Sequence, residues 1–236
     1  MRRPARFGLK FSIILALATV LLRPSVASAQ QSVDFYLGGF VPQSLGSRDV
    51  NDVLVQDASF LDFGSFTGFT FGGDFLIALG DKFDAGLGVG YYQRSVVASD
   101  QFSEFADTGA PILATLQLRI VPFNATMRWL PLGHNHGVQP YVGAGVGVFS
   151  WHYSENGDFV ANDNVTIIHG NFAGSGSAVG PVILGGAHFP ITRSVGLGGE
   201  IRYQWAEGDL PADQGFAGSK IGLGGFNYLL TFHFKF

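Results

Sequence analysis

Apolar and polar positions alternate over the last nine residues of the chain. Every second position is apolar and mostly aromatic, at Tyr228, Leu230, Phe232, Phe234 and Phe236. The positions between them are mainly polar, at Leu229, Thr231, His233 and Lys235. A period of two residues predicts a β-strand with an apolar face on one side and a polar face on the other.

The same alternation returns in seven earlier segments, so we predict eight strands. They are 32–41, 66–79, 83–96, 113–130, 138–151, about 178–189, 195–206 and about 219–236. The connections alternate between long ones, at 42–65, 97–112, 152–177 and 207–218, and short ones, at 80–82, 131–137 and 190–194. Membrane barrels combine an even strand number with short turns at one end and long loops at the other. The predicted fold is therefore all-β, an eight-stranded antiparallel up-and-down transmembrane β-barrel.

Bulky side chains and glycines lie on opposite faces of these strands, which indicates the face that meets lipid. In the third strand, for example, Phe83 and Leu87 share one face while Gly86 and Gly88 share the other. The inside of an eight-stranded barrel is narrow and must be filled by its own side chains. Small residues therefore suit the inside, and large rings suit lipid. The alternative is a soluble periplasmic barrel or sandwich that buries the apolar face.

The segment 113–130 changes phase along its length. Leu116, Leu118 and Ile120 share one face, but the later apolar residues, Ala125, Met127 and Trp129, fall on the other. We expect a β-bulge near Val121-Pro122-Phe123, because a bulge inserts one residue into a strand and also accommodates a proline.

The N-terminal segment has the composition of a secretory signal peptide. Residues 1–10 carry four basic side chains, 11–22 form an apolar run, and Ala27-Ser28-Ala29 is a small-x-small site. The run is too short for a transmembrane helix, and an uncleaved N-terminal anchor is the alternative. We predict a secretory signal peptide at 1–29 and one outer-membrane β-barrel domain at 30–236.

Charge and cysteine content exclude several classes of function. Removal of 1–29 would leave nine basic and 18 acidic residues, and hence a net charge of −9. This excess argues against a nucleic-acid partner, which needs a basic protein surface. The chain has no cysteine, so a disulfide framework, a thiolate nucleophile and a Cys-based zinc site are excluded.

Three sequence features resemble those of a known group of proteins. They are the run PYVGAGVG at 140–147, the run GGEIRY at 198–203, and the aromatic last residue, Phe236. They are similar to the small eight-stranded outer-membrane barrels of Gram-negative bacteria, the group of the OmpA transmembrane domain, OmpX and OmpW. The resemblance implies a location in the bacterial cell outer membrane. It also implies membrane lipid and lipopolysaccharide as neighbours, and the barrel assembly machinery as the partner that inserts the chain.

Strand alternation places nine charged side chains on the inward face. They are Asp34, Asp74, Asp84, Glu200, Arg94, Arg119, Arg128, Arg202 and Lys235. Charges inside a narrow barrel must be paired, so we predict a salt-bridge plug, with a gated ion path as the alternative. Because Asp34 is near the start of the first strand and Lys235 near the end of the last, we expect these two to form an ion pair.

The four long connections are strongly acidic. Their acids are Asp49, Asp52, Asp57, Asp62, Asp100, Glu104, Asp107, Glu155, Asp158, Asp163, Glu207, Asp209 and Asp213, and only Arg48 opposes them. These charges either serve solvation alone or recruit Ca²⁺, Mg²⁺ or a basic extracellular partner. No EF-hand spacing occurs among them.

One further segment, WHYSEN at 151–156, carries side chains that hydrolytic enzymes use. It resembles the His-Tyr-Ser-Asn motif of lipid A 3-O-deacylases, and this resemblance implies His152 as base and Ser154 as nucleophile. Glu155 stands where the motif has Asn, and Asp163 is a possible acid. The remaining pattern, His134-x-His136, has no third ligand and is weak evidence for zinc. We therefore assign no catalytic, cofactor-binding or metal-binding residue.

The predicted function is that of a non-enzymatic outer-membrane β-barrel. Its role would be structural, adhesive or interaction-mediating, through the acidic extracellular loops. Two alternatives remain, which are an outer-membrane lipid A 3-O-deacylase-like esterase and a small OmpW-like pore. No cofactor is expected.

Overall fold

The computed structural model describes residues 30–134, 137–160 and 166–236, so the predicted signal peptide at 1–29 lies outside the described residues. The strands are β1 (Gln31–Pro42), β2 (Leu61–Phe63), β3 (Gly68–Ala78), β4 (Phe83–Glu104), β5 (Pro111–Trp129), β6 (Gln139–Val160), β7 (Ile167–Pro190), β8 (Val195–Gln204), β9 (Glu207–Asp209), β10 (Lys220–Gly222) and β11 (Gly225–Lys235). Two short helices, η1 (Leu45–Ser47) and α2 (Val53–Asp57), lie between β1 and β2. Within the described residues, no helix has the length and apolar character to cross a membrane.

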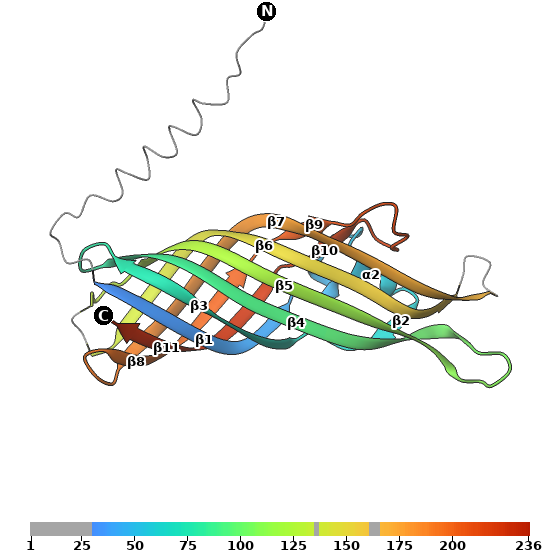
Figure 1. The fold of residues 1–236 in the computed structure, drawn as a ribbon, viewed down its shortest axis with the longest axis horizontal. Coiled ribbons are helices and arrows are strands. Elements are labelled where there is room, and N and C mark those ends of the chain that lie inside the picture. The colour runs from blue at the N-terminus through green and yellow to red at the C-terminus, as the bar shows by residue number, and fades with distance from the viewer. Residues whose placement is uncertain (1–29, 135–136, 161–165) are drawn as a thin grey trace, which may run out of the picture.

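Eight of these strands form a closed antiparallel ring, which confirms the predicted fold (Figure 1). The order around the ring is β1, β3, β4, β5, β6, β7, β8 and β11. The ring closes where β11 pairs with β1, with Ser32 opposite Lys235 and Phe35 opposite Phe232. Both termini of the barrel and the turns after β3, β5 and β7 therefore lie at one end. We call this the terminal end, and the opposite one the distal end.

The wall of the barrel is taller on one side than on the other. β4 to β7 have 19 to 24 residues, whereas β1, β3, β8 and β11 have 10 to 12. The loops predicted at 97–112 and 152–177 are therefore largely strand, because polar residues and glycines hide the apolar period there. The connection at 42–65 meets the chain just after the connection at 207–218, since the N–H groups of Ser219 and Lys220 donate to the Asn51 carbonyl.

The bulge predicted in β5 is wrong. The register of β5 against β6 is continuous from Ala114 to Trp129, so even-numbered residues of β5 point inward throughout. Leu116, Leu118 and Ile120 are buried in the lumen, whereas Trp129 is exposed on the outside. The apolar side chains change face because the lumen is apolar in the distal half, while the outer surface is apolar in the terminal half.

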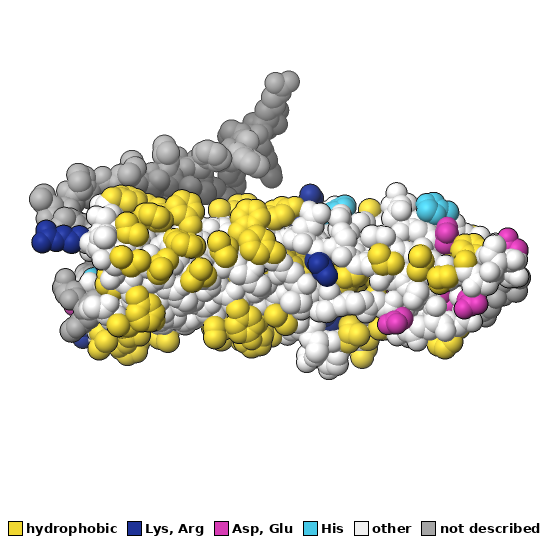
Figure 2. Space-filling model, turned by 90° about the horizontal axis from the view of Figure 1, so that it is seen from below, with side chains coloured by type: hydrophobic (Ala, Val, Ile, Leu, Met, Phe, Trp, Pro, Cys, Tyr) yellow, Lys and Arg dark blue, Asp and Glu magenta, His cyan; other side chains and the backbone are white. Residues whose placement is uncertain are grey.

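Large apolar side chains cover the outside of the terminal half. They include Phe35, Phe75, Phe83, Leu87, Trp129, Val142, Ile183 and Phe234, all of which are exposed. In Figure 2, such side chains (yellow) gather over the part of the barrel near the terminal end, and acidic side chains (magenta) lie at the distal end. Exposed apolar area on this scale is unfavourable in water and suits a lipid bilayer. The terminal half is therefore the membrane-facing part of a transmembrane barrel.

The lumen of the distal half is filled by an apolar core. The core joins wall residues to residues of the connections: Phe40, Val53, Leu54, Leu61, Phe66, Tyr92, Val96, Leu116, Leu118, Ile120, Phe149, Trp151, Tyr153, Leu210, Ile221 and Leu223. The helix α2 contributes Val53 and Leu54, which are both buried. The connection 42–65 thus folds into the distal mouth and plugs it.

Candidate functional site

A buried ion cluster fills the lumen of the terminal half, and Arg128 of β5 lies at its centre. The Arg128 guanidinium contacts the carboxylates of Asp34 at 2.7 Å, Asp74 at 2.6 Å and Glu200 at 3.2 Å. Arg202 of β8 adds contacts to Asp74 at 2.6 Å and to Glu200 at 2.7 Å. All five side chains are at most 5% exposed. The predicted salt-bridge plug is therefore present in the terminal half.

Two tyrosine rings pack on this cluster, and glycines make room for them. The guanidinium of Arg128 lies 4.9 Å from the ring centroid of Tyr141, which also donates a hydrogen bond to Glu200. Arg202 lies 5.1 Å from the centroid of Tyr36. A Cβ at Gly90 would lie 2.7 Å from the Tyr36 hydroxyl, so only glycine admits the ring there. The glycines on the polar faces thus provide space for the plug, as the sequence indicated.

Three of the charged residues that were predicted to lie paired inside the barrel are not paired as predicted. Arg94 and Arg119 are exposed and take no part in the buried cluster. Arg119 is an odd-numbered residue of β5 and points outward, because the register has no bulge to reverse its face. The expected pair between Asp34 and Lys235 is also wrong. The closing register places His233 opposite Asp34, and Lys235 donates to Gln139 at 3.3 Å instead.

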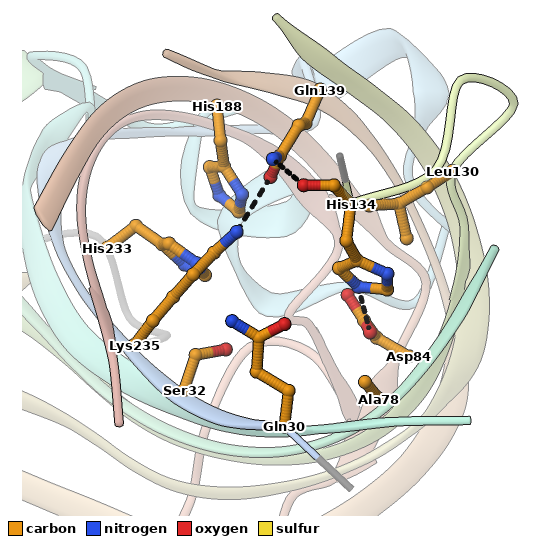
Figure 3. Close-up of a pocket in the computed structure, with 10 residues that line it drawn as sticks. All are labelled: Gln30, Ser32, Ala78, Asp84, Leu130, His134, Gln139, His188, His233 and Lys235. Carbon is orange, nitrogen blue, oxygen red and sulfur yellow. Dashed lines mark hydrogen bonds and ion pairs between the residues drawn. The ribbon is translucent and has the colours of Figure 1, made fainter. Parts of the chain in front are cut away.

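The terminal mouth of the lumen is lined by polar side chains from the turn after β5 and from the strands β1, β4, β6, β7 and β11 (Figure 3). The two nitrogens of His134 lie 2.7 Å from the Asp81 carbonyl oxygen and 2.8 Å from a carboxylate oxygen of Asp84. Both partners are acceptors, and this arrangement favours the protonated ring, in which both nitrogens donate. The hydrogen bond that His134 donates to Asp84 accordingly raises the pKa of His134. The other member of the predicted pair, His136, lies outside the described residues.

The distal plug is anchored by a buried ion pair. Arg48 contacts Asp52 at 2.9 Å and donates to the Gly222 carbonyl at 3.1 Å. Asp52 also caps α2, because its side chain accepts from the N–H of Leu54, and it accepts from the N–H of Gly222. Arg48 and Asp52 therefore tie the first long connection to the last one. Neither residue contributes to the acidic outer surface.

A buried carboxyl pair lies between α2 and the wall. Asp57 of α2 is 1% exposed and accepts a hydrogen bond from the Tyr153 hydroxyl at 3.2 Å. Glu155 of β6 is also buried, and its charge acts on Asp57. Burial, and then the nearby Glu155, raise the pKa of Asp57 to about 8. The pair of Asp57 and Glu155 therefore holds a proton more readily than free carboxyls do, which stabilises the contact of the plug with the wall.

The side chains of the deacylase-like segment do not form a triad among the described residues. His152 and Ser154 point away from the lumen, because Trp151, Tyr153 and Glu155 between and beside them are buried inside it. The Nδ1 atom of His152 lies 3.4 Å from the hydroxyl of Ser175 on β7, rather than bonding to Ser154. Asp163 lies outside the described residues.

Most acids of the long connections remain at the surface, although three are buried. Asp52, Asp57 and Glu155 are buried, as described above. The described acids that are exposed or half-buried are Asp49, Asp62, Asp100, Glu104, Asp107, Asp158, Glu207, Asp209 and Asp213. One basic residue that the sequence pattern placed in the last strand, Lys220, pairs with Glu207 at 2.5 Å. The distal surface therefore retains a strong excess of negative charge.

The sequence matches no protein-family model and no curated protein. Solved structures with similar folds include Neisserial surface protein A, at 13% identity and a TM-score of 0.47, with 89% of this chain and 98% of that one covered. Outer membrane protein W of Escherichia coli has 14% identity and a TM-score of 0.44, over 89% and 100% of the two chains. The attachment invasion locus protein Ail of Yersinia pestis, in complex with the heparin analogue sucrose octasulfate, has 11% identity and a TM-score of 0.41, over 88% and 99%. The closed ring of eight strands and its apolar outer surface, rather than these distant similarities, define the chain as a β-barrel of the bacterial outer-membrane type.

Proposed function

We propose that this protein is a non-enzymatic outer-membrane barrel that acts through its acidic distal surface. The terminal end would face the periplasm, so that the tall wall of β4 to β7 projects outward from the cell. The observation that supports the proposal most is that side chains fill both halves of the lumen. The cluster around Arg128 fills one half, and the apolar core around Phe149 fills the other. A barrel closed in this way offers its outer loops for function, and not a channel.

The charge of the distal surface favours a partner with a basic surface. Exposed acids with few neighbouring bases produce a negative potential that accelerates association with cations and weakens with salt. The lipopolysaccharide around the barrel is itself anionic and is the lateral neighbour. The basic partner would approach from outside the cell.

Two measurements test this proposal. Planar-bilayer recordings of the refolded protein should show no stable single-channel conductance. Binding of poly-L-lysine, used as the basic probe, should weaken as salt rises. It should weaken further in a variant with Glu104→Gln, Asp107→Asn, Asp209→Asn and Asp213→Asn. The substitution Gln214→Ala, in the same outer connection, is the neutral control. Stable conductance, or equal binding by the wild type and the variant with the four substitutions, would contradict the proposal.

A further inference from the structure

Two histidines and one aspartate from three strands meet at the side of the ion cluster that faces the terminal mouth. Asp34 of β1, His188 of β7 and His233 of β11 are all buried, at 0%, 4% and 6% exposure. One donor atom from each lies within 4.8 Å of the other two. The imidazole rings of His188 and His233 stack with their centroids 4.4 Å apart. Residues this far apart in the sequence come together only because the barrel closes.

The Nε2 atoms of His188 and His233 also indicate a ligand site. The Nδ1–H of His233 donates to Asp34 at 2.5 Å, which leaves the lone pair of the neutral ring on Nε2. The Nε2 of His188 lies 3.3 Å from the second oxygen of Asp34. Both Nε2 atoms are buried; that of His233 has no hydrogen-bond partner among the described residues, and that of His188 has only the contact with Asp34. Buried polar atoms without a partner are rare, and two imidazoles that meet beside a carboxylate are a usual set of metal ligands.

The surrounding charge favours a cation at this place. The cluster around the two histidines holds three carboxylates, from Asp34, Asp74 and Glu200, against two guanidiniums, from Arg128 and Arg202. One negative charge is therefore left in a setting with little water. At the mouth, Asp84 pairs with His134, and half-buried Lys235 carries a positive charge that opposes a cation.

The site is accessible from the terminal mouth. A cavity of about 10 Å³ is lined by His188 and His233 together with Lys235, Gln139, Asp84 and His134 (Figure 3). In Figure 3 the side chains of His188 and His233 converge toward the centre of the mouth, where Lys235 also points. This volume is about that of one water, so it admits a single ion and no larger ligand.

We propose that Asp34, His188 and His233 bind one divalent transition-metal ion, Zn²⁺ or an ion of similar preference, at the terminal mouth of the barrel. Two imidazoles and a carboxylate are typical ligands of zinc, cobalt and nickel. Ca²⁺ and Mg²⁺ need more oxygen ligands than the site supplies. Metal binding would join β1, β7 and β11 and so clamp the seam at which the barrel closes.

Cobalt titration of the untagged barrel in detergent micelles tests the proposal. Wild-type protein should give a stoichiometric visible absorption band that Zn²⁺ removes and Ca²⁺ and Mg²⁺ do not. The variants His188→Asn and His233→Asn should each weaken binding by on the order of 100-fold or more, since each removes a ligand. The matched controls are His152→Asn, an outward-facing histidine of the distal half, and His134→Asn, which removes the other histidine group of the mouth. Both should bind as the wild type does.

Three results would overturn the proposal. They are no saturable band with the wild type up to 1 mM Co²⁺ (about the concentration of weak, unspecific binding), unchanged binding in His188→Asn and His233→Asn, or loss of binding only in His134→Asn. Heat-modifiable migration on gels verifies that each variant is folded. If a histidine variant fails to fold, imidazole ¹⁵N chemical shifts of the wild type decide the question. Zinc should move the Nε2 signals of His188 and His233, and signals that stay in place would contradict the site.

Discussion

In the terminal half of the lumen, Arg128 lies among three carboxylates with 1% of its side chain exposed, whereas in the distal half Phe149 and Leu118 are buried among apolar neighbours. The outer surfaces follow the opposite pattern. Apolar rings surround the ion cluster on the outside, and the distal end is acidic (Figure 2). The same strands build both halves, with one register and one direction for each side chain. The strands therefore leave the bilayer midway along their length. Below that level the barrel is polar inside, and above it the barrel is built like a water-soluble protein.

The largest expected effect comes from Arg128 in the terminal half. Arg128→Ala should reduce the free energy of unfolding by about 3–5 kcal/mol, because it leaves buried carboxylates without their cation. Urea unfolding in lipid vesicles measures this loss. The matched control is Arg119→Ala on the same strand, since Arg119 is exposed and faces outward, so its loss should stay within about 0.5 kcal/mol. Similar losses for the two variants would show that the buried cluster adds no more to the free energy of unfolding than an exposed arginine does.

The distal half should respond to a cavity in its apolar core. Leu118→Ala should lower the free energy of unfolding by about 2–4 kcal/mol, since Leu118 is fully buried and its neighbours are held by the barrel wall. Leu113→Ala on the same strand is the control, because Leu113 is 46% exposed on the outer surface. If the two substitutions have equal effects, the distal lumen is not a packed core and the comparison between the halves fails.

The distal plug should also loosen as the pH rises. The folded protein holds the pKa of Asp57 at about 8, above the value of about 3.9 in an unfolded chain. The protonated form is therefore favoured by folding. Its stabilising effect is complete below about pH 4 and is lost progressively as the pH rises through about 8. Hydrogen exchange of 43–67 should accordingly speed up, beyond the rise in the chemical exchange rate, between about pH 6 and pH 8.

The double substitution Asp57→Asn and Glu155→Gln separates this effect from general alkaline destabilisation. Both amide side chains are neutral at every pH, so exchange of 43–67 in the variant should vary with pH only as the chemical exchange rate does. The same dependence in the wild type would show that the Asp57 and Glu155 carboxyls do not govern the plug. The ion cluster around Arg128, whose members are not part of this pair, should keep its protection in both proteins.

The sequence predicted the terminal half better than the distal half, for physical reasons. Alternation alone places Asp34, Asp74, Arg128 and Arg202 inward, because a lipid-facing strand has one apolar and one polar face. In the distal half the strands are outside the bilayer, so either face of a strand can be apolar. The apolar residues of β5 therefore change face along the strand, and in the sequence this change resembled a bulge. The burial of Val53 and other residues of the long connections depends on contacts between distant parts of the chain, which periodicity does not report.

The cluster of Asp34, His188 and His233 was missed for a related reason. Alternation places Asp34 and His233 on the polar faces of their strands but assigns no face to His188, and the register at the closing seam decides which of them meet. A shift of two residues would place Lys235 rather than His233 opposite Asp34, as the sequence pattern suggested. Only the strand pairing resolves this choice, because alternation is the same for both registers.

The smallest expected effect concerns the outer wall of the distal half. Replacing His152 and Ser154 together with Ala should leave the lipid A of expressing cells unchanged. His152 contacts Ser175 rather than Ser154, and the nearby acid, Glu155, points into the lumen beside Asp57. A nucleophile needs a base within hydrogen-bond reach, and a base needs an orienting acid on the same side of the wall. Mass spectrometry of lipid A from cells with the wild type, the double variant and no barrel measures the result. Loss of an ester-linked acyl chain with the wild type alone would mean that these two side chains are catalytic, and that the distal wall carries chemistry on its outer face.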